Sequence, residues 1–516
     1  MGPRRDERGG VLRCASARDR WILWGQTQEF DCAAWHRRSL SLYDEFERSK
    51  RQFDSSRHMY ANAGLYPLTG RGRIKTDSVF AELGRKLQNP SGRFGMILPT
   101  GIATDATTQY FFKDLVQTHT LVSLFDFENR RPLFEGVDSH YIFCVPTWGG
   151  GADETEQAQF AFFAHDPADL NREDARFELT PDEIQLLNPN TGTCPIFRTR
   201  RDAEITLGIY RRVPVLINEN DPVNGNPWGI SFMQGLFNMT SDSHLFHTRE
   251  DLEDDGWELI GNVFERELPN GGGVTQMLPL YEAKMLHIYD TRWATYEPDG
   301  SVRPMTEAEK AERQAPLPRY WVAESEVDKK LEGKWDKPWL LGWRDIARAT
   351  DERTIIATKL PRVPVGNKFP VALPSCSSDQ SNLLQALLSS RACDYVARQK
   401  IGGASVNYFL FKQIAVPTMA GIEASGTMSP RSVSRKVDRL NGWVSHDAER
   451  RELRAELDAW AMTVYGVSRE DCVHMLGTFP NTDGDDLILR AFDAMMHAKV
   501  TGADYQTPWN EDSDDR

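Results

Sequence analysis

Between residues 76 and 147 the sequence alternates between helical periodicity and short runs of apolar residues. Apolar runs of this length, bounded by turn residues, are typical of strands buried on both faces. Alternation of helix and buried strand predicts a mostly parallel sheet with crossover helices, and therefore an α/β fold. The expected helices cover 76–87 and 107–117, with Thr76 or Asp77 as the cap of the first, and the expected strands cover 94–98, 121–127 and 141–147.

The regions on either side have other patterns. Apolar residues recur at helical spacing from Ala34 to Phe53, and again on one face of 451–465, where Gly466 is expected to end the helix. Residues 216–435 are rich in Trp, Pro and Gly and predict short mixed elements of an α+β domain. We therefore expect an N-terminal remnant at 1–55, an α/β part at 56–157, a bridge at 158–215, an α+β domain at 216–435, and a helical region with an acidic tail at 436–516.

Charge and cysteine content exclude some classes of protein. The 61 Lys and Arg against 75 Asp and Glu give a net charge of −14, which excludes a uniformly basic protein that coats nucleic acid. Residues 341–417, however, hold ten Lys and Arg against five Asp and Glu, so a local basic face is possible. The seven cysteines show no CxxC pair and fit a reducing cytoplasm, and no apolar run is long enough to span a membrane.

Several catalytic and metal-binding patterns are missing from the sequence. There is no GxxxxGK[ST] loop, no GxSxG turn and no acidic pair set apart by its spacing, so P-loop NTPase, hydrolase and glycosidase activities have no support. His244 and His247 have the spacing of a helical metal pair, but no Cys or third His completes a tetrahedral set nearby. We expect neither a metal site nor a catalytic residue within this chain.

Seven segments, in one order from about residue 60 to the C-terminus, resemble the adenine-N6-specific DNA methyltransferases of restriction–modification and phage-defence systems. In that family the methylase and its target recognition domain share a chain. The segments are 67–83 (PLTGRGRIKTDSVFAEL), 92–112, 121–144 (LVSLFDFENRRPLFEGVDSHYIFC), 187–205, 341–367, 394–417 and 453–480. The resemblance implies part of a Rossmann-like methyltransferase sheet, followed by a target recognition domain and terminal helices.

Two parts of the family's chemistry have no counterpart in these segments. Methyl transfer from S-adenosylmethionine needs a Gly-containing loop after the first strand, and the family's base clamp resembles N-P-P followed by an aromatic residue. The sequence has no Pro-Pro dipeptide, and Gly70-Arg71-Gly72 is an isolated GxG that fits a tight turn. We therefore expect the recognition part of such an enzyme, with chemistry dependent on a partner that supplies the missing methylase half. The alternative is a non-catalytic DNA-recognition subunit of a restriction or phage-defence complex.

The resemblance also assigns two partial sites. Thr76, Asp77 and Phe80 would begin the helix beside the adenine of S-adenosylmethionine, although the same residues fit an ordinary helix start. Phe125, Phe127 and Asn129 end an expected strand, at the edge where open α/β sheets bind ligands, and could hold an extruded target base. The alternative for these three is that the aromatic rings fill the core and Asn129 caps a turn.

The local basic excess predicts contacts to double-stranded DNA. Lys and Arg contact phosphates and fix the register of a protein on a duplex, and Gly402-Gly403 would allow backbone N–H groups to approach a phosphate. The expected contacts are Arg344, Lys359, Arg362, Asn367, Lys368, Arg398, Lys400 and Lys412. Other subunits of a defence system are further possible partners.

Overall fold

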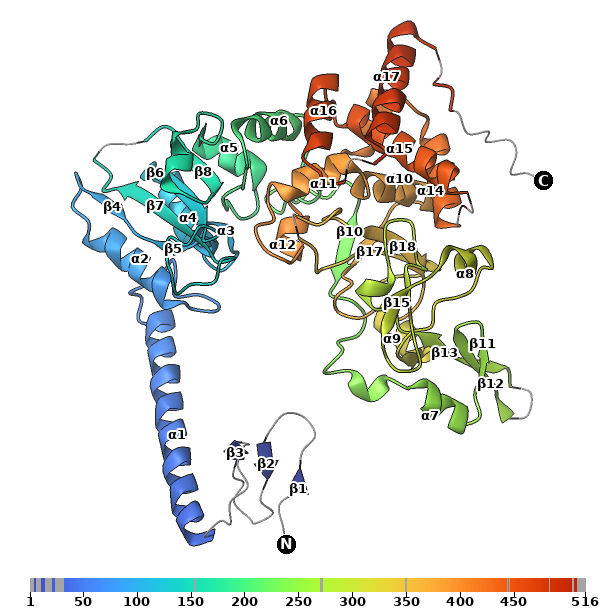
Figure 1. The fold of residues 1–516 in the computed structure, drawn as a ribbon, viewed down its shortest axis with the longest axis horizontal. Helices are drawn as coiled ribbons and strands as arrows, with labels where there is room; N and C mark the ends of the chain where they lie inside the picture. The colour runs from blue at the N-terminus through green and yellow to red at the C-terminus, as the bar shows by residue number, and fades with distance from the viewer. Residues whose placement is uncertain are drawn as a thin grey trace.

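The computed structural model describes residues 42–507 apart from 153–154, 270–271, 349, 443, 445, 482 and 504, together with the backbone of 4–5, 11–13, 21–23 and 32–41. It is a mixed α/β protein with one mixed parallel and antiparallel sheet, several antiparallel sheets and a group of C-terminal helices (Figure 1). Residues 25–30, within the expected N-terminal remnant, and residues 511–516, within the expected acidic tail, lie outside the described residues. Among the described residues no helix is both long and apolar enough to cross a bilayer.

The mixed sheet has the strand order β4-β7-β6-β8-β9, with β5 also paired to β7. Its strands are β4 (Arg93–Gly95), β5 (Leu98–Pro99), β6 (Leu121–Glu128), β7 (Ile142–Gly149), β8 (Ala158–Ala164) and β9 (Phe177–Leu179). Only β6 and β8 run parallel, and the other pairs are antiparallel. The expectation of a mostly parallel sheet is therefore wrong, because β6 joins β7 through a loop and not through a crossover helix.

The expected strand at 94–98 is also wrong in part. It is divided into β4 and β5 at the edge of the sheet, and Ile97 between them is 54% exposed. The helices of this part are α1 (Cys32–Asn62), α2 (Thr76–Leu87), α3 (Gly101–Thr104) and α4 (Gln109–Gln117). Neither Thr76 nor Asp77 caps α2, because Lys75 is the N-cap residue and offers no side-chain hydrogen bond.

The middle of the chain forms antiparallel sheets. One four-stranded sheet contains β10 (Ile230–Met233), β19 (Val371–Pro374), β17 (Trp339–Trp343) and β18 (Ala357–Pro361), and a second contains β11 (Glu258–Ile260), β12 (Val263–Glu267), β13 (Val274–Pro279) and β16 (Trp321–Ala323). Strands β14 (Ala294–Tyr296) and β15 (Val302–Pro304) pair with each other. Strands β1 (Arg4–Arg5), β2 (Val11–Arg13) and β3 (Trp21–Leu23) pair near the N-terminus.

Short helices connect these strands. They are η1 (Pro167–Asn171), α5 (Pro181–Leu187), α6 (Arg200–Tyr210), η2 (Ser243–Leu245), α7 (Arg249–Asp254), η4 (Ala283–Met285), α8 (Glu307–Ala311) and α9 (Glu324–Leu331). Many begin with a Thr cap: in α5, α6, α7 and α8 the Thr side chain accepts a backbone hydrogen bond that an acidic residue three positions later reciprocates.

The C-terminal part is helical, and its helices begin within the stretch that the sequence analysis expects to be α+β, before the helical region expected at 436–516. It contains α10 (Ser378–Leu388), α11 (Arg391–Arg398), α12 (Tyr408–Phe411), α13 (Met419–Ser425), α14 (Pro430–Asn441), α15 (Asp447–Val464), α16 (Arg469–Gly477) and α17 (Asp485–Thr501). The helix expected at 451–465 is α15, and Gly466 follows it with φ +68°, a left-handed conformation that suits glycine at a helix end.

Residues 187–197 join the mixed sheet to the C-terminal part. Cys194 N donates to Ala103 O at 2.9 Å, while Ile196 N donates to Gln399 O at 2.7 Å. The side chain of Gln413 accepts from Asn190 N at 3.0 Å, in the same connecting segment. These backbone contacts place residues 400–413 beside the sheet, and one continuous hydrophobic core extends across both parts.

Candidate functional site

A cleft of about 640 Å³ lies between the mixed sheet and residues 400–410. In Figure 1, α3 on the sheet side lies opposite α12 on the other side. On the sheet side, the cleft is lined by the 73–75 loop, the 99–107 segment, Asp126, Tyr141, Ile142, Phe162, Phe163 and Ile196. Its other wall is formed by Lys400 and residues 402–410. The ends of β6 and β8 reach the cleft, which is the edge at which open α/β sheets bind ligands.

Asp126 is the buried acidic group in the wall formed by the sheet, where Asp105 also lines the cleft. Thr100 Oγ1 donates to its Oδ2, and Phe163 N donates to Oδ1 at 3.1 Å. The side chain is almost fully buried, and burial raises the pKa of this carboxyl to about 6 despite both hydrogen bonds. A carboxyl of this kind changes its proton occupancy close to neutral pH, at the inner wall of the cleft.

Two cations, Arg73 and Lys75, line the sheet side of the cleft. Arg73 is exposed, and Lys75 forms a 3.2 Å ion pair with Asp105. Both cations come from the short loop between Gly70 and α2, which the sequence GRGRIK supplies. Within the described residues Arg73 forms no ion pair, so its guanidinium is available to an anionic ligand.

The opposite wall offers backbone and amide groups. Gly402 and Gly403 are exposed in it, and a Cβ on Gly403 would meet nothing within 4 Å. Asn407 caps α12 through its side-chain oxygen. The backbone of the two glycines is therefore accessible at this wall, and its contact with a phosphate stays a prediction.

Lys400 also belongs to this wall, but its ammonium points away from solvent. Lys400 Nζ donates to Leu187 O and, at 2.5 Å, to Asn188 Oδ1, and it lies 4.6 Å from the centre of the Tyr210 ring. Burial lowers the pKa of this lysine well below its usual value. Its ammonium therefore ties residues 187–188 to the 400–410 segment.

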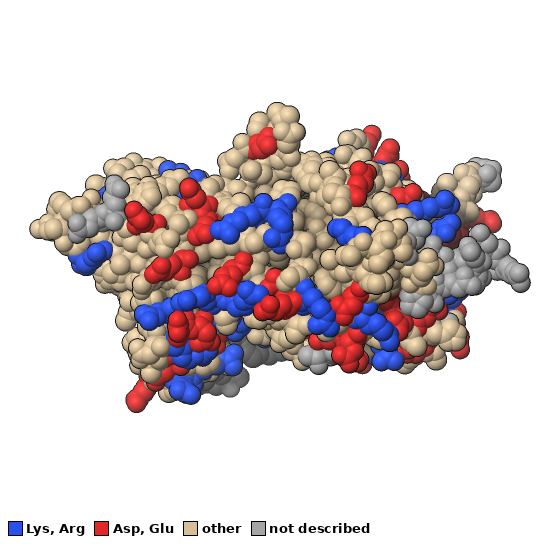
Figure 2. All heavy atoms as spheres, turned by 90° about the horizontal axis from the view of Figure 1, so that it is seen from above, with Lys and Arg blue, Asp and Glu red and all other residues tan. Residues whose placement is uncertain are grey.

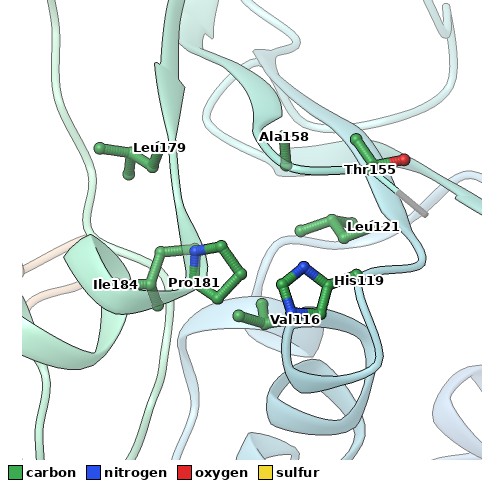
Figure 3. Close-up of a pocket in the computed structure, with 8 residues that line it drawn as sticks. All are labelled: Val116, His119, Leu121, Thr155, Ala158, Leu179, Pro181 and Ile184. Atoms are coloured by element: carbon green, nitrogen blue, oxygen red, sulfur yellow. The ribbon is translucent and has the colours of Figure 1, made fainter.

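A second cavity, where β6 and β8 begin, has a different character. It measures about 10 Å³ and is lined by His119, Thr155 and six apolar residues (Figure 3). Its volume is that of about one water molecule. It is a packing gap between α4, the sheet and α5, and not a ligand site.

The three residues expected beside the cofactor do not line either cavity. Thr76 is exposed, Asp77 is half-buried and Phe80 is 59% exposed, all on the first turns of α2. No polar cradle for a methyl donor is formed by these side chains. The placement of these three residues beside S-adenosylmethionine therefore stays a prediction.

The expected base-pocket residues face away from the cleft. Successive residues of a strand point to opposite faces, so Phe125 and Phe127 lie on the face of β6 opposite Asp126. Phe127 stacks on Phe143 with ring centres 5.6 Å apart, within a small separate hydrophobic cluster that Phe125 also contacts. The core alternative considered for these two rings is the one that the structure shows.

Asn129 acts as the structural anchor of a loop. Its Nδ2 donates to the carbonyls of Phe134 at 3.0 Å and Val137 at 2.9 Å, and its Oδ1 accepts from Phe134 N at 3.1 Å. The side chain is fully buried. Because every polar atom of the amide is used within the loop, Asn129 has no group free for a target base.

Two of the expected DNA contacts are buried cations. Arg398 is 9% exposed and donates to the carbonyls of Asp351 and Glu352, and Lys400 is 3% exposed. Neither side chain can reach a phosphate in this structure. The prediction for Arg398 and Lys400 is therefore wrong, because a charge count along the sequence does not separate buried from exposed cations.

The other expected cations already have partners within the chain. Arg362 pairs with Asp328, Lys368 with Asp345 at 2.8 Å and Lys412 with Glu219 at 2.6 Å. Arg344 donates to two backbone carbonyls, and Lys359 donates to Ser378, Ser381 and Asn382. Among the side chains of these three ion pairs, that of Lys368 is the most exposed, at 56%. Asn367 beside it is half-buried.

The wider charge distribution agrees with this pairing. On the face seen in Figure 2, Lys and Arg are interspersed with Asp and Glu. His244 and His247 lie at η2 and just after it, and no group of metal-ligating side chains is found among the described residues. The charged side chains at the cleft are therefore those that line it: Arg73, Lys75, Asp105, Asp126 and Lys400.

Sequence reasoning missed Arg73, Lys75 and Asp126. Asp126 lies between the two phenylalanines that the sequence analysis names, on the opposite face of the same strand. A signal for Arg73 and Lys75 was present in GRGRIK, a glycine-containing basic turn directly before a helix.

Comparison with known proteins gives a distant structural likeness. No protein-family model and no curated protein matches the sequence. Among solved structures, the type IIL restriction-modification enzyme MmeI, determined in complex with DNA, aligns over 82% of this chain at 12% identity with a TM-score of 0.40. The type IIG restriction endonuclease BpuSI aligns over 80% at 13% identity with a TM-score of 0.27. In both cases the alignment covers 52% of the other chain, so this chain spans about half their length.

Proposed function

We propose that this chain is the DNA-recognising part of a site-specific adenine-N6 DNA methyltransferase of the restriction–modification or phage-defence kind. The observation that carries the proposal is the 640 Å³ cleft at the ends of β6 and β8, with Arg73 and Lys75 on its sheet side and two exposed glycines in its far wall. Double-stranded DNA is the partner that fits these features, because phosphates bind to Arg, Lys and exposed backbone N–H groups.

Methyl transfer from S-adenosylmethionine would then depend on a second polypeptide. The sequence offers no N-P-P-aromatic segment, and the α2 residues form no methyl-donor cradle. The partner would supply the cofactor loop and the base clamp. We retain Arg344, Lys359, Arg362, Asn367 and Lys368, in and beside β17 and β18, and Lys412 after α12 as contacts to DNA, and we add Arg73 and Lys75 at the cleft.

DNA binding by the purified chain tests the proposal. A fluorescent duplex should bind with an affinity that falls steeply as salt rises from 50 to 200 mM, because bound cations displace counterions. Arg73→Glu should weaken binding to any duplex. The matched control is Arg93→Glu, another exposed arginine that does not line the cleft. Binding that ignores salt, or equal effects of the two substitutions, would contradict a DNA site in the cleft.

The second candidate is a non-catalytic DNA-recognition subunit of a defence complex. It is favoured by the same absence of a donor cradle among the described residues. The two candidates differ in one result. A neighbouring gene that encodes the missing motifs, and that restores methylation of duplex DNA when its product is mixed with this chain, supports the methyltransferase. Methyl transfer by this chain alone would contradict both.

A further inference from the structure

Internal hydrogen bonds fix the conformation of the loop at 130–141, between β6 and β7. Besides the three hydrogen bonds of Asn129, Val137 N donates to Phe134 O at 3.2 Å and Tyr141 N donates to Asp138 O at 3.0 Å. Asp138 also accepts from His140 N at 2.8 Å. A buried amide with all its hydrogen bonds made is costly to disturb, so the loop has one defined conformation.

This rigid loop presents apolar side chains to solvent. Leu133 is 39% exposed, Phe134 is 41%, Val137 is 42% and Tyr141 is 48%. Phe134 is supported by an edge-to-face contact with Phe143, whose ring centre lies 5.2 Å away. Folding gains nothing from holding four large apolar groups in water, so their grouping on one loop indicates a surface that contacts something else.

The loop begins and ends beside the cleft. It begins at Arg130, four residues after Asp126 and just beyond the end of β6, and its last residue, Tyr141, lines the cleft together with Ile142. The loop carries both kinds of charge. Arg130 pairs with Glu128 at 2.6 Å, Asp138 accepts a hydrogen bond from His140 N, and Arg131 and Glu135 are exposed. The apolar groups, and not a net charge, therefore distinguish this rim of the cleft.

We propose that the 130–141 loop is an apolar wedge that enters the base stack of duplex DNA and occupies the space left by an extruded nucleotide. Leu, Phe and similar apolar side chains are the groups that proteins insert between base steps. An enzyme that acts on a base inside a duplex must take it out of the stack, and filling the gap keeps it out. The inference rests on the proposed function and assigns a role there to Leu133, Phe134 and Val137.

The test compares two duplexes of one sequence, one fully paired and one with a single abasic site. An abasic site already has the vacated space, so the intact chain should bind it about tenfold more tightly. Leu133→Ala with Val137→Ala should reduce this preference to about twofold or less, with affinity for the paired duplex nearly unchanged. Both substitutions keep the backbone atoms that Asn129 contacts, so the loop remains folded.

Val223→Ala is the matched control, since Val223 is 84% exposed in a loop that does not line the cleft, and it should keep the full preference. Equal affinity of the intact chain for the two duplexes would overturn the wedge while leaving DNA binding in place. The wedge is equally overturned if the double variant retains the tenfold preference. Absence of binding to either duplex would overturn the proposed function and the wedge together.

Discussion

At the scale of single residues, the cleft depends on which face of a strand each side chain takes. Asp126 points toward the cleft and main core, and its neighbours Phe125 and Phe127 pack on the other face with Phe143. A carboxyl in that position is unusual because burial disfavours its charged form. Its hydrogen bonds from Thr100 and Phe163 hold it in place.

Asp126 predicts a particular dependence of stability on pH. Burial raises its pKa to about 6, above the usual 3.8, so the folded chain holds a proton that the unfolded chain releases earlier. The stabilisation is complete below about pH 4 and is lost as pH rises through about 6, for a total of about 3 kcal/mol. Asp126→Asn stays neutral and lacks this loss. As pH rises from 4 to 8, the free energy of unfolding of the variant, measured with urea, should therefore increase relative to that of the native chain.

The control for this experiment is Asp336→Asn, at an exposed carboxyl. Its unfolding free energy should follow that of the native chain over the whole pH range. Parallel curves for Asp126→Asn and the native chain would show that the carboxyl is not buried as described.

Asn129 predicts a local effect. Asn129→Ala removes three hydrogen bonds to the 130–141 loop, each worth about 1 kcal/mol. We expect backbone amides of the loop to exchange with deuterium much faster, while those of β6 and β7 remain protected. Unchanged exchange in the loop would mean that its conformation does not depend on this amide.

At the scale of elements, buried ionic contacts join the C-terminal helices. Lys436 of α14 donates to Glu456 of α15 at 2.8 Å, with side-chain exposures of 0% and 1%. Tyr505 and Thr507, beyond α17, also donate to Glu456. The pair therefore fixes α14, α15 and the following segment in one arrangement.

Breaking this pair should cost far more than breaking an exposed one. Lys436→Met leaves Glu456 buried without its cation, which costs about 3–5 kcal/mol of unfolding free energy. Adding Glu456→Gln should recover part of the loss. The control is Arg490→Met, because Arg490 and Glu452 form an exposed pair worth less than about 1 kcal/mol. Similar losses for the two single variants, measured by urea denaturation, would contradict the burial of Lys436.

At the scale of the whole molecule, one hydrophobic core runs from the mixed sheet to α17, but the sheet of β11, β12, β13 and β16 has a small cluster of its own. That cluster consists of Leu252, Trp257, Phe264 and Trp321. Its few apolar contacts predict that this region opens first. In native-state hydrogen exchange, amides of β11 and β12 should exchange before those of β17, which belongs to the main core. Simultaneous exchange of all three strands would indicate a single cooperative unit.

Local patterns along the chain were enough to predict the types of many elements. Apolar spacing located α2, α4, α15, β6 and β7, and glycine after α15 located its end, because these signals depend on neighbours within one or two turns. The glycines at 402–403 were likewise placed in an accessible segment.

Folding in three dimensions sets which face of β6 borders the cleft and makes β7 run antiparallel to β6. It also sets which cations have an acidic partner. A strand pattern shows two faces without saying which one borders a cavity, and a charge count does not see the acidic partner that folding brings beside Lys368 or Lys412. Those contacts join residues more than twenty positions apart. Their energies depend on burial and distance in the folded chain, which no local stretch of sequence contains.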